Sequence, residues 1–156
     1  MKRPELSPDI AADERIVRAV KTPTHLNLKN GKLKGAAYRP QVGQTALSCM
    51  RQIIGADDCK NRAVELCLEG KGAYSGLSVI TAKAVRAEGS EVIDWPEDYY
   101  GHAHIVHPFP APVADDPASA KLNATATLHY QKLADAAKYY EDPQPLTNGW
   151  HGSSLE

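Results

Sequence analysis

The chain lacks the features that define several broad classes of protein. No stretch approaches the ~20 consecutive apolar residues that would cross a bilayer. The charged start at Met1–Glu5 leads to no apolar signal core. The three cysteines are odd in number and have no CxxC spacing, which disfavours a disulfide framework or a cysteine-rich zinc site. We therefore expect a cytoplasmic protein that does not associate with membranes.

The chain also lacks an excess of charge of either sign. Lys and Arg number 18 against 19 Asp and Glu, for a formal net charge of −1. Proteins that bind duplex nucleic acid usually carry a basic excess or a basic stripe, because neutralising phosphates supplies most of their affinity. The basic clusters Lys29–Lys34 and Lys132–Lys138 are diluted by acidic or neutral residues. An RNA-binding domain using Tyr38, Trp95 and the lysines is therefore the weakest alternative, and nucleic acid is not expected as a partner.

The length of 156 residues and the 42% hydrophobic fraction suit a single globular domain. At the amino terminus, Ser7-Pro8 supply a capping residue and a first-turn proline, and acidic residues precede basic ones. This pattern predicts a helix over residues 8–20. Asn30-Gly31 then lies between two short alternating segments, which is typical of a β-hairpin. A strand is expected next over residues 46–54, with Cys49 and Arg51 on one side.

Further helices and strands are expected along the rest of the chain. The predicted helices are 57–69, 81–88 and 119–140, and the first two begin at the capping residues Asp57 and Thr81. The predicted strands are 77–80, 91–95 and 102–107. Because helices and strands do not strictly alternate, we expect an α+β fold. Its sheet would be mixed and partly antiparallel, with an N-terminal hairpin, two central helices and a C-terminal helix. Residues 1–141 would form this domain and 142–156 a loose tail, whose Leu155-Glu156 is typical of a tag remnant.

The sharpest chemical feature is His102-Ala103-His104. Residues two apart on a strand face the same way, so His102 and His104 could both reach one metal ion at ~2.0–2.1 Å. Asp94, Asp98 and His25 are the available third ligands. The alternative is one buried, hydrogen-bonded histidine beside solvated ones. No cofactor follows from the sequence, and a divalent metal is less favoured than none.

A second feature is Cys49, the one cysteine that the helical stripe of the 57–69 segment does not explain. A Cys–His pair with His102 could support acyl transfer, because the imidazole draws the thiol toward thiolate. Arg51 could lower the pKa of the thiol further. The candidate catalytic residues are therefore His102, Cys49 and Arg51. The more common fate of such a cysteine is burial as a small hydrophobic residue.

A third set of residues could bind an anionic substrate. If their strands are adjacent, Arg39 and Arg51 could hold a phosphate or carboxylate through their planar guanidinium groups. Tyr38 could stack on a ring, Ser48 adds a neighbouring hydroxyl, and Trp95 could form an aromatic wall. The alternative is a solvated sheet edge with weak surface ion pairs.

Several short motifs resemble those of a loose group of small, uncharacterised bacterial proteins. They span about Tyr38 to Ile105 and comprise the LSxxR segment Leu47–Arg51, the strand Gly76–Ala82, the RAxG segment Val85–Gly89 and the HAxI segment Gly101–Ile105. The resemblance implies no particular activity. It implies only that Ser48, Arg51, His102 and Ala103 form one region of interest, and His104 departs from the pattern.

Two functions of different classes follow. The first is a binding or interaction protein, such as an accessory subunit of a multi-component system, whose helix 119–140 docks a protein partner through its apolar face. The alternative for that face is packing on the sheet of this domain, which is the more common outcome. The second is a hydrolase or group-transfer enzyme that uses the His102–His104 strand with Arg51 and Cys49. The enzyme hypothesis predicts that His102 lies within hydrogen-bond reach of Cys49, Ser48 or Arg51 in a concave site.

Overall fold

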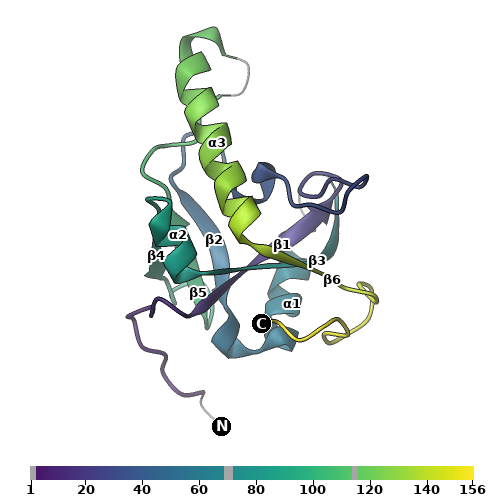
Figure 1. The fold of residues 1–156 in the computed structure, drawn as a ribbon. Helices are drawn as coiled ribbons and strands as arrows, with labels where there is room; N and C mark the ends of the chain where they lie inside the picture. The colour runs from purple at the N-terminus through teal and green to yellow at the C-terminus, as the bar shows by residue number, and fades with distance from the viewer. Residues whose placement is uncertain (1–2, 69–71, 114–115) are drawn as a thin grey trace.

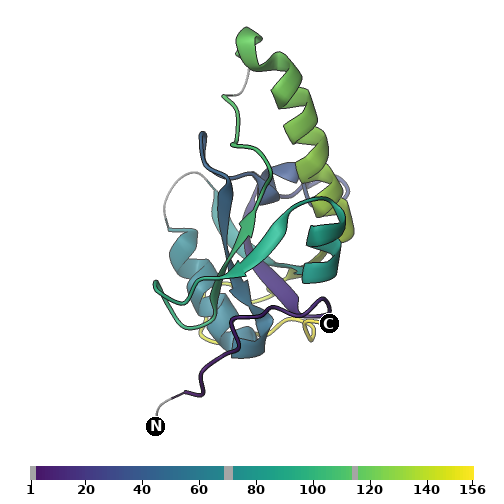
Figure 2. The same ribbon diagram turned by 90° about the vertical axis from the view of Figure 1, so that its left-hand side faces the viewer.

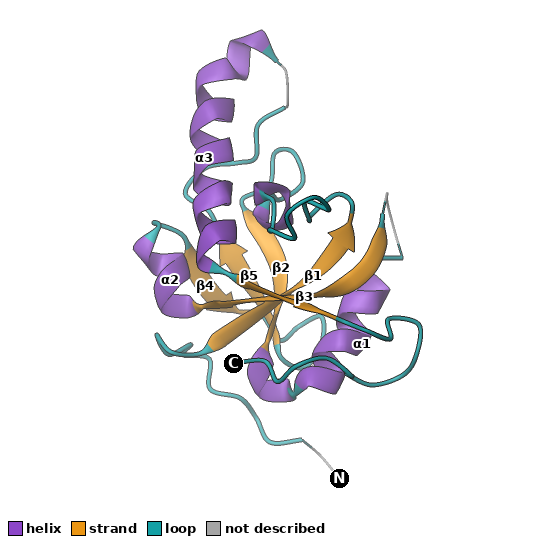
Figure 3. Cartoon of the chain, turned by 45° about the vertical axis from the view of Figure 1, so that its right-hand side comes forward, coloured by secondary structure: helices purple, strands orange, loops and turns teal. Residues whose placement is uncertain are grey.

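The computed structural model describes residues 3–68, 72–113 and 116–156. Six strands form one open sheet in the order β4-β5-β2-β1-β3-β6 (Figures 1 and 3). The strands are β1 Arg15–Thr22, β2 Ala46–Arg51, β3 Ala73–Thr81, β4 Glu91–Asp94, β5 His102–Val106 and β6 Lys138–Glu141. The helices are α1 Ala56–Leu66, α2 Ala82–Ala87 and α3 Ala120–Ala136, with short 3-10 turns η1 Gly35–Tyr38, η2 Gln52–Ile54 and η3 Pro117–Ser119. The predicted α+β class is confirmed, and the strand pairings are antiparallel.

Both faces of the sheet are covered, and each has its own core. The turn η1 and helices α2 and α3 lie over one face, while α1 lies over the other (Figures 1 and 2). Because side chains alternate along a strand, neighbours on β2 enter different cores. Cys49 packs in the α3-side core and Met50 in the α1-side core. None of the described helices has both the length and the apolar character needed to cross a membrane.

The predicted helix over 8–20 is wrong, because residues from Arg15 onward form the central strand β1. The strand is bordered by β2 and β3, and Ile16 and Val17 are fully buried on opposite faces. Burial on both faces produces a largely apolar run that periodicity does not distinguish from a buried helix. The Ser7 hydroxyl accepts from the Asp9 amide at 3.2 Å, which forms a local turn and not a helix start. Pairing with two remote strands outweighs this local capping signal.

The hairpin at Asn30-Gly31 is present in a minimal form. One antiparallel bridge joins Leu26 and Leu33, and Gly31 adopts a φ of +70°, which glycine tolerates without a Cβ penalty. The chain then enters η1 instead of extending the hairpin as a longer strand. The hairpin therefore lies outside the six-stranded sheet.

The helix predicted over 119–140 ends at Ala136, and the following residues form the edge strand β6, which pairs with β3. Part of the α3 face that was expected to dock a protein partner packs inside this domain. Ala126 and Leu133 are fully buried in the α3-side core. Leu122 and Ala136 on the same face remain exposed.

Residues 142–156 were predicted as a loose tail and have little regular structure, yet they make buried contacts. The Lys60 ammonium group from α1 lies 2.9 Å from the Asp142 carboxylate and also donates to the Gly149 carbonyl at 2.7 Å. Leu155 is only 4% exposed. Asp57, expected to cap α1, lies inside its first turn and accepts from the Trp150 amide at 2.6 Å. This segment is therefore fastened to α1.

Candidate functional site

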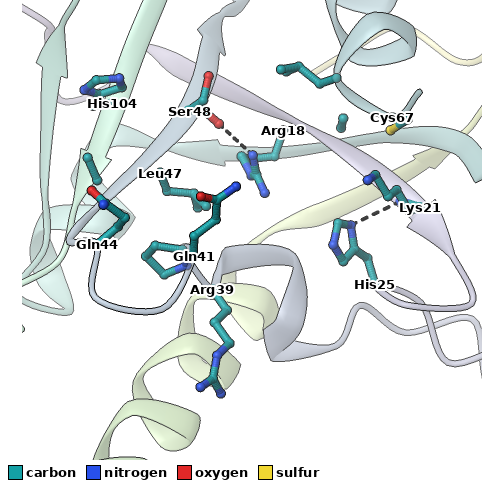
Figure 4. Close-up of a pocket in the computed structure, with 14 residues that line it drawn as sticks. Arg18, Lys21, His25, Arg39, Gln41, Gln44, Leu47, Ser48, Cys67 and His104 are labelled. Carbon is teal, nitrogen blue, oxygen red and sulfur yellow. Dashed lines mark hydrogen bonds between the residues drawn. The ribbon is translucent and has the colours of Figure 1, made fainter. Parts of the chain in front are cut away.

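A cavity of about 510 Å³ lies where β1 and β2 separate (Figure 4). The two strands pair only at Ile16 with Arg51 and at Val17 with Met50. Beyond these pairs β1 stays with β3 and β2 stays with β5, so a cleft opens between them. The cleft is lined by Arg18, Ala19, Lys21, His25, Arg39, Pro40, Gln41, Gln44, Ala46, Leu47, Ser48, Leu66, Cys67 and His104. Its volume is in the range of small-molecule sites.

Arg18 spans this gap in the sheet. Its Nη1 donates to the Ser48 carbonyl oxygen at 2.7 Å, and its Nε and Nη2 donate to the Ala37 carbonyl oxygen at 3.2 and 3.0 Å. A guanidinium group has five N–H donors, so these bonds leave two without a protein acceptor among the described residues. Within that part of the chain no carboxylate lies within ion-pair distance of Arg18. Burial lowers the pKa of Arg18 from its ordinary value, yet arginine stays charged.

Arg51, predicted to hold an anion, is already neutralised. Its guanidinium group binds both carboxylate oxygens of Glu14 at 2.6 and 2.7 Å, Asp94 at 3.1 Å and the Ser7 carbonyl oxygen at 2.7 Å. The hydrogen bond and charge of Glu14 raise the pKa of Arg51 despite its burial. Arg51 does not line the cleft. Its ion pairs tie the N-terminal segment and the end of β4 to the centre of the sheet, which is a structural role.

The other polar residues of the cleft are mainly donors. The Nδ1 of His25 accepts from the Lys21 amide at 3.1 Å, so its hydrogen lies on Nε2. Burial lowers the pKa of His25 to about 4, which keeps it neutral near pH 7. Gln41 and Gln44 supply amides. The guanidinium group of Arg39 turns away toward α3 and donates to the Pro112 carbonyl oxygen at 2.5 Å (Figure 4). Among the lining residues that the structure describes, none is acidic.

Ser48 and His102 form a hydrogen-bonded pair beside the cleft. The Ser48 hydroxyl lies 2.7 Å from the Nε2 of His102, and the Nδ1 of His102 lies 3.0 Å from the Trp95 carbonyl oxygen. Because a carbonyl only accepts, the hydrogen of neutral His102 lies on Nδ1, and Nε2 accepts from Ser48. Burial, followed by the neighbouring His104, lowers the pKa of His102 although Asp98 opposes this. The predicted proximity of His102 to Ser48 is therefore present.

Asp98, His102 and His104 also come together, with potential ligand atoms within 4.8 Å of one another. The Asp98 carboxylate lies 3.4 Å from the Nδ1 of His102. However, both nitrogens of His102 are engaged, one with Trp95 and the other with Ser48. A divalent ion bound by His102 would have to replace one of these bonds. The other predicted third ligands lie elsewhere, since Asp94 binds Arg51 and His25 lines the far side of the cleft.

Cys49 does not meet His102. It lies on the α3 side of the sheet, where its thiol donates to the Ala103 carbonyl oxygen at 3.2 Å. It is fully buried, and this burial raises the pKa of the thiol to about 12. The predicted Cys–His pair is therefore not formed, because adjacent residues of a strand face opposite sides.

The predicted aromatic contacts are divided between core and surface. Tyr38 is fully buried and its hydroxyl is 3.0 Å from that of Ser78, so its ring is not available for stacking on a ligand. Trp95 is 42% exposed and stacks on His104 with ring centroids 5.0 Å apart. Trp95 thus contacts the two histidines of the site, His102 through its carbonyl oxygen and His104 through its ring.

Arg18 was not among the site residues predicted from the sequence, whereas Asp98 was expected only as a third metal ligand. Arg18 interrupts the apolar run Ile16-Val17-Arg18-Ala19-Val20 and is half-buried, and an unpaired charge within such a run is uncommon. That signal was hidden while the segment was interpreted as a helix. No protein-family model, curated protein or solved structure matches this chain. Its function is therefore inferred from the geometry of the cleft.

Proposed function

We propose that the protein binds a small anionic molecule, bearing a carboxylate or phosphate group, in the cleft between β1 and β2. The observation that carries this proposal is Arg18, a cation at the gap in the sheet whose acceptors among the described residues are all carbonyl groups. Arg51, one strand away, shows how the same side chain is neutralised when its role is structural.

The energetic reason is the cost of placing a charge in a poorly solvated site without a counter-ion. Carbonyl oxygens satisfy individual N–H groups but supply no net negative charge. A carboxylate or phosphate would supply that charge and accept the two unused N–H groups in a charge-assisted hydrogen-bond pair. The amides of Gln41 and Gln44 would then offer further donors from the cleft walls. The cleft is thus complementary to an anion of modest size.

The test is calorimetric titration with citrate and with pyrophosphate, which represent the carboxylate and phosphate classes. We expect at least one to bind, with an affinity that falls as salt rises because the contact is ionic. Arg18→Gln should weaken that binding about tenfold or more, as loss of a charged hydrogen-bond partner costs about 1.5–3 kcal/mol. Arg15→Gln is the matched control, since Arg15 is an exposed arginine on the same strand outside the cleft.

Circular dichroism would establish that each variant is folded, and Gln41→Ala offers a second, milder change in the cleft wall. Binding of neither anion to the folded wild-type protein would overturn the proposal. So would binding that Arg18→Gln and Arg15→Gln weaken equally, because the charge would then act nonspecifically.

A further inference from the structure

We propose that Ser48 is a nucleophile activated by His102, and that it cleaves esters or thioesters of small anionic acids. The hydroxyl–imidazole geometry carries the assignment of Ser48. The choice of an anionic acyl group rests on the proposed binding function of the cleft.

The pair has the arrangement that a serine nucleophile needs. The 2.7 Å bond joins the hydroxyl to the Nε2 lone pair, because the Trp95 carbonyl oxygen holds the hydrogen of His102 on Nδ1. A nucleophile must be within hydrogen-bond reach of its base, and a third group should orient the base. Here the Trp95 carbonyl orients the ring. The Asp98 carboxylate, 3.4 Å from Nδ1, would stabilise the imidazolium ion once it forms.

Access distinguishes this serine from a purely structural one. Ser48 is half-buried and lines the cleft, whereas His102 behind it is only 1% exposed. The carbonyl oxygen of Ser48 accepts from Arg18 at 2.7 Å, so the cation of the cleft lies beside the same residue. In Figure 4 the Ser48 carbonyl faces Arg18. A substrate with its anion at Arg18 would therefore bring a nearby acyl carbon close to β2.

The reaction has two balanced steps. The Ser48 oxygen attacks the acyl carbon while its proton moves to the Nε2 of His102. The bond from the acyl carbon to the alcohol or thiol then breaks, and that leaving group takes the proton. Water next attacks the acyl-Ser48, giving one proton to His102, which returns it to the Ser48 oxygen as the carboxylic acid leaves. No oxidant, reductant or further reactant is required.

The decisive experiment combines covalent labelling with turnover. A fluorophosphonate probe should label the folded protein once, with the modified peptide mapped to Ser48, and Ser48→Ala should abolish labelling. Cys49→Ala is the matched control, since it alters the next residue on the opposite face of the sheet. The rate of labelling should fall by about 10²-fold or more in His102→Gln, the usual scale of base catalysis. If His102→Gln does not fold, Asp98→Asn replaces it as the test, because Asp98 is an exposed side chain. Asp98→Asn should slow labelling severalfold.

Turnover then tests the substrate class with mono-(4-nitrophenyl) succinate and the neutral 4-nitrophenyl butyrate. We expect the anionic ester to be preferred by about tenfold or more, which corresponds to about 1.4 kcal/mol. Ser48→Ala should abolish hydrolysis of both esters, whereas Arg18→Gln should remove only the preference.

The two proposals fail in different ways. A folded protein that binds citrate or pyrophosphate through Arg18 but shows neither labelling nor turnover would overturn the role of Ser48 and leave the anion site intact. The anionic substrate class would be overturned if Ser48 is labelled but the wild-type protein hydrolyses the anionic and neutral esters equally well, and Arg18→Gln does not change their ratio. Labelling at another serine would also refute the assignment.

Discussion

The molecule contains two serine–imidazole pairs that look alike locally and differ in access. Ser48 lies 2.7 Å from the Nε2 of His102, and Ser90 lies 2.7 Å from the Nδ1 of His107. In each pair the other ring nitrogen of the histidine meets a backbone carbonyl, that of Trp95 at 3.0 Å or of Tyr38 at 2.8 Å. Both imidazoles are thereby held in one neutral tautomer with a lone pair directed at a serine.

The second pair is closed. The Nε2 of His129 on α3 lies 2.8 Å from the Ser90 oxygen, so Ser90 donates to His107 and accepts from His129. All three side chains are at most 9% exposed, and every partner belongs to the protein. This network links the start of β4, the end of β5 and α3. The enclosed Ser90 pair has a structural role, whereas Ser48 lines the cleft.

The largest expected difference between the pairs is in reactivity. Ser48→Ala should remove fluorophosphonate labelling entirely, whereas Ser90→Ala should leave the labelling of Ser48 within about twofold, since activated nucleophiles exceed unactivated ones by about 10²–10⁴-fold. Mass spectrometry of the labelled peptides measures both. Labelling that depends on Ser90 would show that the enclosed pair, not access from the cleft, determines reactivity.

The next largest expected effect is a loss of stability in acid that comes from the enclosed pair. Burial lowers the pKa of His107 to about 4, below the 6.5 of an unperturbed histidine. Between these values the unfolded chain binds more protons than the folded one, so the free energy of unfolding falls as pH falls from about 6.5 to about 4. The loss from His107 should reach about 3 kcal/mol, as urea unfolding at several pH values would measure.

His25 has a similarly lowered pKa of about 4, so the acid experiment needs two variants. His107→Gln and His25→Gln should each flatten the dependence on pH to a similar extent, because the two pKa values are lowered alike. A dependence that neither variant flattens would mean that these histidines do not determine acid stability.

Loss of a serine hydroxyl should also affect stability differently in the two pairs. Ser90→Ala removes the hydroxyl that joins the buried His107 and His129, whose own ring nitrogens lie 3.3 Å apart, and should cost about 2 kcal/mol. Ser48→Ala should cost about 1 kcal/mol or less, because water from the cleft can hydrate His102. Urea denaturation at pH 8 measures both. A larger loss in Ser48→Ala would contradict the assignment of Ser90 as the structural serine.

The smallest expected effect belongs to His104. If His102 serves Ser48, His104→Ala should change labelling less than about threefold, since His104 makes a ring contact and no proton transfer. Equilibrium dialysis with zinc supplies the contrasting measurement. Stoichiometric zinc bound by the wild-type protein and lost in both His104→Ala and Asp98→Asn would instead assign this cluster to a metal.

Local signals in the sequence predicted several elements well. Thr81 was expected to begin a helix, and its hydroxyl accepts from the Ala84 amide at the start of α2. The strands β2, β4 and β5 were located from alternation and their flanking turns. The misassigned strands β1 and β6 owe their conformation to pairing with β3 across long stretches of chain. Such partners leave no trace in a local window.

The sequence by itself determined the α+β class, the strand carrying His102 and His104, and the division of Ser48 and Cys49 between opposite faces, because alternation is a local property of the chain. Only the tertiary structure decided which neighbours those residues meet. The antiparallel register of β2 with β5 placed Ser48, and not Cys49, beside His102. The separation of β1 from β2 left Arg18 without a carboxylate beside the cleft in the described chain. Register and separation depend on contacts between distant segments, which the order of residues alone does not reveal.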